Sequence, residues 1–184
     1  MAGSHITVTV SPQTAEARLQ HLQAILANPS GLLDQIGSRL RDTTRERFKT
    51  QTSPDGNSWQ ALQPRYQRRK KKNKDKVLTL NGFLRHSSIT WQFDGQDAVK
   101  VGSNRKYAAI HQFGGTIAKK ARQSTVHFGV GKAKHLFVKK SQAVRSKQVT
   151  IGAHEVTIPA RPFLGLSAHD RREITEITLE WLQR

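Results

Sequence analysis

Two stretches of this 184-residue chain carry so many like charges that neither can form part of a hydrophobic core. The first, residues 64–76, reads PRYQRRKKKNKDK and holds eight basic residues against one acid, Asp75. The second, residues 115–149, holds nine lysines and arginines and no acid. Like charges repel one another and keep their hydration, so both stretches should stay exposed until an acidic partner meets them. The core must therefore be built from the remaining segments.

The rest of the composition supports one core of ordinary size. Hydrophobic residues make up 35% of the chain, which is enough for one domain. The formal net charge of +18 favours an acidic partner, either nucleic acid or the acidic face of a protein. The chain has no cysteine, which excludes disulfides, thiolate metal sites and cysteine nucleophiles. No apolar run approaches the roughly 20 residues of a membrane span, and the N-terminus lacks the apolar stretch of a signal peptide, so we expect an unprocessed cytoplasmic product without membrane contact.

The first half of the chain predicts two helices and a hairpin. Residues 1–12 are expected to form an N-terminal strand or tail, with strand-like alternation at 6–10, and residues 13–184 a single domain. Helices are expected near 13–27 and 31–50, each with an apolar stripe that we interpret as core, with a partner groove as the alternative. The stripes are Ala15, Leu19, Leu22 and Leu26 in the first helix, and Leu33, Ile36, Leu40 and Phe48 in the second.

The middle of the chain changes its period from helical to alternating. The turn at Pro54-Asp55-Gly56 should let Trp59 fold back onto the helix ends. Residues 78–84 are expected to form a short helix or turn. From Ile89 onward, apolar residues alternate with polar ones on both sides of Asp94-Gly95, which predicts a β-hairpin over 88–102.

The last third combines a basic arm with a compact corner. Residues 107–115 indicate one or two helical turns ended by glycines, and the basic arm 115–149 is expected to be a β-hairpin around a glycine turn. A further strand is expected at 148–158. In IPARPFLGLS the two prolines should end that strand and the apolar residues should seat a corner in the core. Ser167 is a good N-cap for a terminal helix, with Asp170 completing a capping box.

A search for catalytic chemistry finds no site. The sequence has no HExxH, no glycine-rich phosphate loop and no nucleophile elbow, and its acids lie singly in turns or on helix surfaces. His127 and His135 lack an evident third metal ligand, and His111 has no carboxylate near it in sequence. We therefore expect no enzymatic activity, no metal and no cofactor.

The unusual motifs occur in a definite order along the chain. A turn with PDGNSW precedes the basic run, and LTLNGFLRHSSI and VGSNRKYAAIHQFGG follow it. The basic arm then leads to IPARPFLGLSAHDRREI and the terminal helix. This order resembles the phage virion-morphogenesis family, which includes tail-completion protein S of P-two-like phages and protein G of Mu-like phages. The resemblance runs from about Leu32 to the C-terminus. Its most specific parts are YAAIHQFGG and PARPFLGLSAHDRR.

The resemblance implies an α+β domain that acts in virion assembly and has no active site. The expected fold has two N-terminal helices, a small mostly antiparallel sheet, a long basic arm and a C-terminal helix. The expected function is to form a ring, with a hexamer as one option, at the head–tail junction of a tailed phage or prophage. Its partners would be neck, connector and tail-tube or tail-terminator proteins, with DNA in the channel as a further candidate. It would be located in the host cytoplasm during assembly and then in the virion neck or tail.

The candidate residues fall into three groups. Residues expected to serve the fold are Trp59, Tyr107, Phe113, Gly114, Pro159, Pro162, Phe163 and Gly165. Residues expected at a subunit or partner interface are His111, Gln112, Phe128, Leu136, Phe137 and Arg161. Residues expected to contact DNA or an acidic partner are Arg65, Arg68, Arg69, Lys70, Lys71, Lys72, Lys74 and Lys76.

Two alternatives stay open at this point. Arg161 could instead bond a carbonyl at the edge of the core, and His111 with Gln112 could be a buried hydrogen-bonded pair. The competing function is a basic nucleic-acid-binding accessory protein of phage packaging or morphogenesis, with residues 64–76 as its phosphate-contacting arm.

Overall fold

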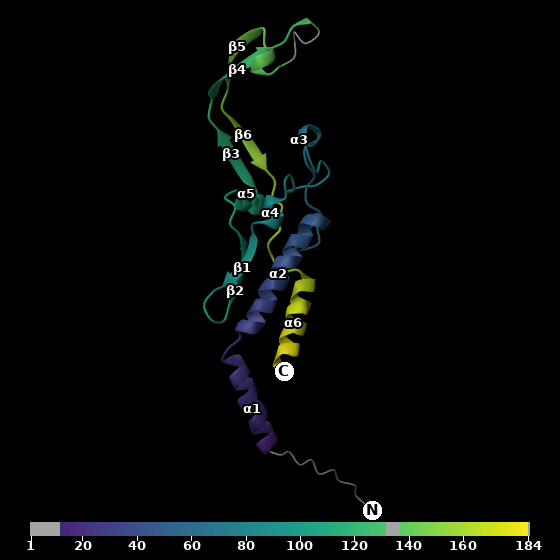
Figure 1. Cartoon of the computed structure of the whole chain (residues 1–184), viewed down its shortest axis with the longest axis vertical. Coiled ribbons are helices and arrows are strands. Elements are labelled where there is room, and N and C mark those ends of the chain that lie inside the picture. Colours follow the sequence, from purple (N-terminus) through teal and green to yellow (C-terminus); the bar gives the residue numbers. More distant parts are fainter. Residues whose placement is uncertain (1–11, 132–136, 184) are drawn as a thin grey trace, which may run out of the picture. The chain divides into compact units, whose positions relative to one another are not determined.

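The computed structural model describes residues 12–131 and 137–183, and within it the chain divides into two compact units (Figure 1). Unit 1 comprises residues up to Ala108 together with those from Arg161 onward, and unit 2 comprises Ala109–Ala160. The strand expected at residues 6–10, and Leu136, lie outside the described residues. Helices and antiparallel strands are both present, as the α+β expectation requires.

Unit 1 contains five helices and one hairpin among its described residues. The helices are α1 (Pro12–Leu26), α2 (Ser30–Thr50), α3 (Pro64–Arg69), α4 (Phe83–His86) and α6 (Ala168–Leu182), and the strands are β1 (Ile89–Phe93) and β2 (Val99–Ser103). The two strands pair antiparallel, from Ile89 opposite Ser103 to Phe93 opposite Val99. The predictions of the two N-terminal helices, the hairpin and the terminal helix are therefore confirmed.

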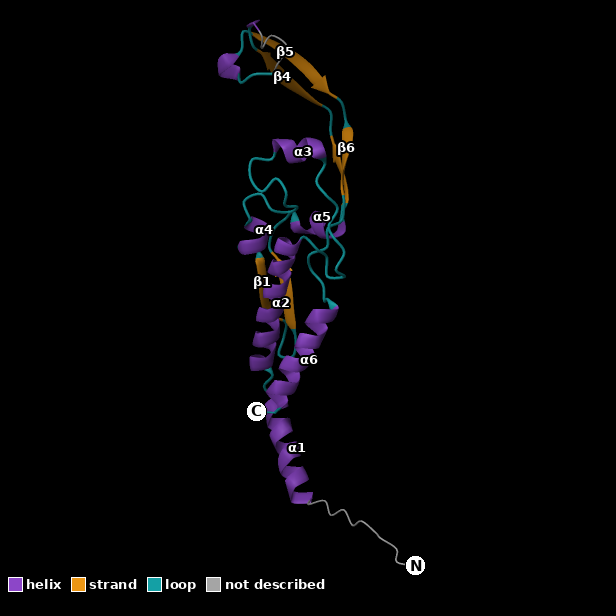
Figure 2. Ribbon diagram, turned by 90° about the vertical axis from the view of Figure 1, so that its right-hand side faces the viewer, coloured by secondary structure: helices purple, strands orange, loops and turns teal. Residues whose placement is uncertain are grey.

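Helix α2 is the central element of unit 1, and it packs against the β1–β2 hairpin and against α6 (Figure 2). Gly37 explains how the hairpin comes so close. A Cβ at this position would lie 2.5 Å from Cδ2 of Trp91 and 2.9 Å from a methyl group of Val99, so any side chain would push the hairpin away. A glycine that costs helix propensity is thus tolerated because it lets the sheet approach the helix.

The core lies where α2 ends. Phe48 and Phe163 are almost completely buried, with ring centroids 5.3 Å apart, and Trp59 packs edge-on against Phe48 at 5.4 Å. The indole Nε1 of Trp59 donates to the carbonyl of Pro162 at 2.7 Å. The expected return of Trp59 onto the helix end is therefore confirmed. The remaining buried members of this core are Val77, Leu84, Ile89 and Ala108.

Helix α1 differs from its prediction. None of its residues is buried, and Leu19 and Leu26 are 65% and 60% exposed, so the interpretation of its stripe as core is wrong. The physical reason is that the hairpin and α6 already cover α2. Helix α1 does make a hydrogen bond to the end of α6, from Arg18 to the carbonyl of Leu182 at 3.2 Å.

Unit 2 is a two-part β-ribbon. Helix α5 (Ala108–Phe113) leads into it, and the ribbon is formed by β3 (Gly115–Lys119), β4 (Arg122–Phe128), β5 (Arg145–Ile151) and β6 (His154–Ile158), with a 3₁₀ turn at Lys140–Gln142. β3 pairs antiparallel with β6, and β4 pairs antiparallel with β5. The strand expected at 148–158 is therefore split into two, and its second part pairs back to the start of the arm. No described residue of Ala109–Ala160 is buried.

Candidate functional site

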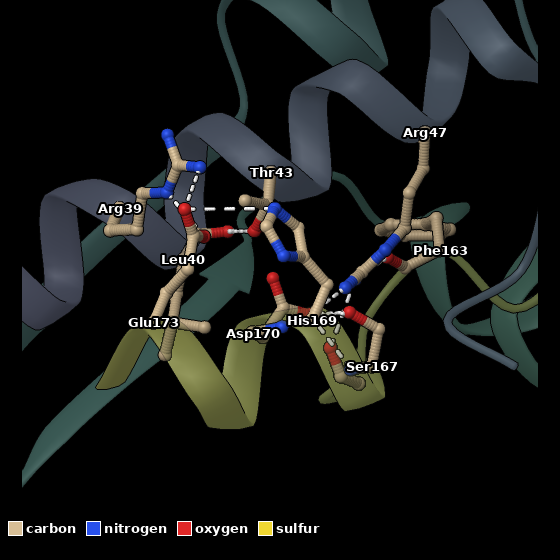
Figure 3. Close-up of polar contacts among 10 residues, drawn as sticks. Arg39, Leu40, Thr43, Arg47, Phe163, Ser167, His169, Asp170 and Glu173 are labelled. Carbon is tan, nitrogen blue, oxygen red and sulfur yellow. Dashed lines mark hydrogen bonds and ion pairs between the residues drawn. The ribbon is translucent and has the colours of Figure 1, made fainter. Parts of the chain in front are cut away.

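The C-terminal motif is anchored in unit 1 by a buried ion pair between Arg47 of α2 and Asp170 of α6 (Figure 3). Asp170 is 1% exposed and its Oδ2 also accepts from the backbone N–H and the hydroxyl of Ser167, each at 2.7 Å. Ser167 in turn accepts from the N–H of Asp170, which completes the expected capping box. One carboxylate therefore caps α6 and ties it to α2.

Arg47 also holds the corner that precedes α6. Its Nη1 donates to the carbonyl of Phe163 at 3.0 Å (Figure 3). It also donates to the carbonyl of Gly165 at 2.9 Å. Gly165 has φ +144°, and a Cβ there would lie 2.8 Å from Cγ of Pro54, so both its backbone angle and its surroundings favour glycine. The apolar corner of the motif is thus fixed by a cation from another helix.

Electrostatics keep this pair charged. Burial alone would raise the pKa of Asp170, but the hydrogen bonds from Ser167 and the charge of Arg47 outweigh it, so the pKa lies below its ordinary value. Burial lowers the pKa of Arg47, and the neighbouring Asp170 opposes that shift. A second pair, Arg39 with Glu173, joins the same two helices nearer the surface. These pairs serve the packing of α2 against α6.

Arg161 is buried, at 7% exposed. Its Nε donates to the carbonyl of Gln60 at 3.0 Å and its Nη2 to that of Ala61 at 3.3 Å. Burial lowers its pKa. The contact with core-edge carbonyls, one of the two roles left open by the sequence, is the one present within the chain. An additional role at an interface stays a prediction.

The two most specific sequence motifs, YAAIHQFGG and PARPFLGLSAHDRR, contain the positions where the chain passes from one unit to the other. YAAIHQFGG contains the crossing from Ala108 to Ala109, and PARPFLGLS contains the return from Ala160 to Arg161. Within unit 2, Gly114 has φ +71°, and a Cβ there would lie 2.7 Å from the backbone N of Ala160. The glycine therefore lets the two ends of unit 2 meet at its base.

The other residues of the first motif occupy different environments. His111 and Gln112 are half-buried on α5 and both interact with other residues of the chain. Tyr107 is 43% exposed and Phe113 is 79% exposed, so Phe113 fills no core position. Pro159 and Pro162 are half-buried on either side of Arg161. No group of three or more histidines, cysteines or acids that could hold a metal occurs in the part of the chain that the structure describes.

The basic segment 64–76 is mostly available for contact. Six of its eight cations are exposed, and the structure gives none of them an ion pair with a described carboxylate; these are Arg65, Arg68, Arg69, Lys71, Lys72 and Lys74. Lys70 departs from its expected role because it is only 5% exposed. Its ammonium donates to the carbonyls of Asn73, at 2.5 Å, and Lys76, so it holds its own loop together and does not face outward.

The ribbon of unit 2 has two unlike faces in its β4–β5 part. On one face the apolar residues Val126, Phe128, Val149 and Ile151 lie among Ser124 and three cations, Arg122, Arg145 and Lys147, whereas the other face carries only Gln123, Thr125, His127, Ser146, Gln148 and Thr150. Phe128 contacts Phe137 at 5.5 Å between ring centroids, and the guanidinium of Arg145 lies 5.4 Å from the ring of Phe128. Phe137 itself is 75% exposed. The sequence showed the apolar residues but not their alignment on one face, because that depends on the strand register.

Sequence comparison identifies a family and two relatives, one of which matches less than half of the chain. The model of the phage virion morphogenesis family matches residues 10–183. Protein G of Escherichia phage Mu, which is named for capsid assembly, is 35% identical over 101 residues, covering 46% of this chain and 64% of the Mu protein. The Mu-like prophage FluMu G protein 2 of Haemophilus influenzae is 25% identical over 171 residues, covering 93% of this chain and 91% of that protein. No solved structure matches the chain. None of the described helices is long and apolar enough to cross a membrane.

Proposed function

The chain belongs to the phage virion morphogenesis family, and on that premise we propose that it forms a ring at the head–tail junction and joins the tail to the head. In this role it would be made in the host cytoplasm and end in the neck or tail of the virion. Its other partners would be neck, connector and tail proteins. Its own role is structural and not enzymatic.

The observation that carries this proposal is the ribbon of unit 2. A two-stranded ribbon alone is only marginally stable in water, and no described residue of this unit is buried. The face that carries Val126, Phe128, Val149 and Ile151 also carries three cations, and Phe128 contacts the exposed Phe137, so these apolar side chains gain stability if another protein surface with acidic groups covers them. In a ring every subunit has an identical neighbour, so each ribbon meets the same surface and the assembly closes.

The core of unit 1 supports a structural role. Its buried charges, Arg47, Lys70, Arg161 and Asp170, all bond to groups of the same fold. Such bonds hold the corner, the loop and the terminal helix in fixed positions, which a subunit needs if its neighbours are to dock reproducibly.

The test removes the outer part of the ribbon while keeping its base. Residues 122–151 are replaced by an Asn-Gly turn, which leaves the β3–β6 pair to close as a short hairpin. We expect the purified variant to fold but to stay monomeric where the wild type forms rings, as measured by sedimentation. Phage particles assembled with it should contain separate heads and tails.

A matched variant separates this function from nucleic-acid binding. It changes the six exposed cations of residues 64–76 to glutamine and leaves the ribbon intact. We expect this variant to assemble normally. If the ribbon variant still formed rings and joined particles, the proposed role of the ribbon would be wrong.

A further inference from the structure

The cations of unit 1 divide into two classes. On α2, Arg39, Arg41, Arg45, Arg47 and Lys49 all lie within ion-pair distance of a carboxylate. Between residues 64 and 86 the situation is reversed, since no lysine or arginine there has an ion pair with a described residue. The carboxylates of Asp42, Glu46, Asp170 and Glu173 pair with cations of α2. They therefore do not pair with the cations of residues 64–86, and that segment retains its positive charge.

The loop from Lys70 to Gly82 is held in a defined shape. The ammonium of Lys70 bonds two of its carbonyls, and Nδ2 of Asn73 donates to the carbonyl of Leu80 at 3.0 Å. Asn73 and Leu78 have positive φ angles of 49° and 55°. For leucine this is an uncommon and costly conformation, which persists only where the surroundings enforce it.

This loop and α4 enclose a pocket of about 360 Å³. Its lining includes Lys72, Lys76, Arg85 and His86 and contains no acidic residue. Thr79 also lines it, and its hydroxyl is buried without a hydrogen-bond partner among the described residues.

Arg85 is the most informative residue of the pocket. Its side chain is half-buried, its Nε is buried without a hydrogen-bond partner, and no hydrogen bond or ion pair joins its guanidinium to any described residue. A buried N–H donor without an acceptor is unfavourable, and an anion in the pocket would supply the acceptor.

We propose that this pocket, formed by Lys72, Lys76, Thr79 and Arg85, binds a backbone phosphate of double-stranded DNA. The guanidinium and the Thr79 hydroxyl hold one phosphate, while the exposed cations of residues 64–74 contact neighbouring phosphates. Binding is independent of base sequence, since phosphate contacts carry no sequence information. The proposal does not rest on the ring, because every residue in it belongs to one unit of one chain.

Charge density favours DNA over an acidic protein as the occupant. Residues 64–76 supply eight cations against one acid, and six of those cations are exposed. Duplex DNA offers about one negative charge per 1.7 Å of its axis, so neighbouring phosphates can meet the whole run at once. The pocket adds what a merely solvated basic surface lacks, a fixed position for one phosphate.

The test measures binding of the full chain to a random-sequence DNA duplex at several salt concentrations. Arg85→Gln should weaken binding about tenfold, the cost of a lost charge-assisted hydrogen bond, and reduce the slope of log K against log salt by about 0.9. Thr79→Val should weaken binding about fivefold and leave the slope unchanged, because it removes a neutral donor. That variant keeps the side-chain volume and removes an unpaired hydroxyl, so it should fold as well as the wild type.

The control is Arg172→Gln, which removes an exposed cation of α6 that has no ion pair with a described residue. Its effect on affinity should be less than twofold. Equal losses in Arg85→Gln and Arg172→Gln would show that only net charge matters and would overturn the proposal. So would a loss of polyglutamate binding in Arg85→Gln with DNA binding unchanged, because the pocket would then take a protein carboxylate. Failure of ring assembly would leave these measurements unaffected.

Discussion

Arginine serves different purposes at three positions of this protein, Arg47, Arg161 and Arg85. The difference lies in which acceptors each guanidinium meets. Arg47 meets a carboxylate and two carbonyls, and Arg161 meets two carbonyls only. Arg85 meets no described acceptor at all. At the residue scale, arginines whose guanidinium groups bond within the fold contribute to its stability. The arginine without a bonded acceptor is the one assigned to function.

Replacing Asp170 by asparagine should destabilise the protein by about 3–5 kcal/mol at neutral pH, because Arg47 would keep its buried charge without a counterion. The pKa of Asp170 is lowered in the folded state from an ordinary value of 3.8. The folded protein therefore binds fewer protons than the unfolded chain as pH falls past that value, and stability decreases. The substitution should remove this part of the acid sensitivity. Urea unfolding between about pH 7 and pH 3 measures both effects.

Asp42→Asn is the matched control for that experiment. The Asp42 side chain is 54% exposed and pairs with Arg41, so its loss should cost less than about 1 kcal/mol. Equal losses for the two variants would contradict the view that burial makes the Arg47–Asp170 pair important.

Phe163→Ala should destabilise unit 1 by about 3–5 kcal/mol, the usual cost of emptying a buried aromatic position. Phe163 is 0% exposed and packs against Phe48 at the centre of the core. Leu166→Ala is the control, since Leu166 belongs to the same motif but is 43% exposed. Denaturant midpoints compare the two variants. A small loss for Phe163→Ala would mean that the corner contributes little to the core.

Local rules predicted some of these residues and could not predict others. The Ser167 cap, the return of Trp59 and the buried corner follow from turn chemistry and apolar spacing within a few residues. The Arg47–Asp170 pair joins positions 123 apart in sequence, and Arg47 is one of four arginines on α2 that look alike in the sequence. The pocket around Arg85 depends on loop conformation, including Leu78 at φ 55°, which no propensity indicates.

At the scale of elements, a periodic sequence pattern predicts a helix or strand more reliably than it predicts which other elements pack against it. The helical period correctly predicted α1, yet its stripe stays exposed because α2 is covered by the hairpin and α6. The alternating period predicted strands in the arm, but the break at Gly152-Ala153 and the pairing of β6 with β3 emerged only in the structure. Packing between elements depends on surfaces that are distant in sequence.

Gly114→Ala should disrupt the base of the ribbon. The substitution would place a Cβ 2.7 Å from the backbone N of Ala160 at φ +71°, so the β3–β6 pair would have to shift. We expect lost amide protection in β3 and β6 and weaker assembly, with the unfolding midpoint of unit 1 unchanged. Gly152→Ala is the control, because a Cβ there meets no atom within 4 Å. Similar exchange in both variants would rule out a special role for Gly114.

At the scale of the whole molecule, the chain combines a unit with a core and a unit without buried residues among those described. Unit 1 contains the aromatic core and the buried ion pair, whereas unit 2 depends on two antiparallel pairings. These differences in burial predict different local stabilities, because opening free energy follows buried contacts.

Hydrogen exchange should reveal this difference. In the unassembled protein, amides of β4 and β5 should exchange at least about a hundredfold faster than those of α2, since the ribbon opens without global unfolding. Assembly should slow exchange in β4 and β5 while leaving α2 unchanged. Equal protection of ribbon and helix in the monomer would show that unit 2 is stable by itself.

The pairing of Gly115 with Ile158 at the base of the ribbon has an evolutionary consequence. Unit 2 begins and ends at neighbouring positions, so its length can change without altering the spacing of any residue in unit 1. Each strand must gain or lose residues in twos, because a change of one would turn its apolar side chains to the opposite face. Related chains should therefore differ in ribbon length by multiples of four residues, two in each strand, while the corner around Phe163 keeps its length. Such changes would let the ribbon adapt to a new assembly partner while the core stays the same.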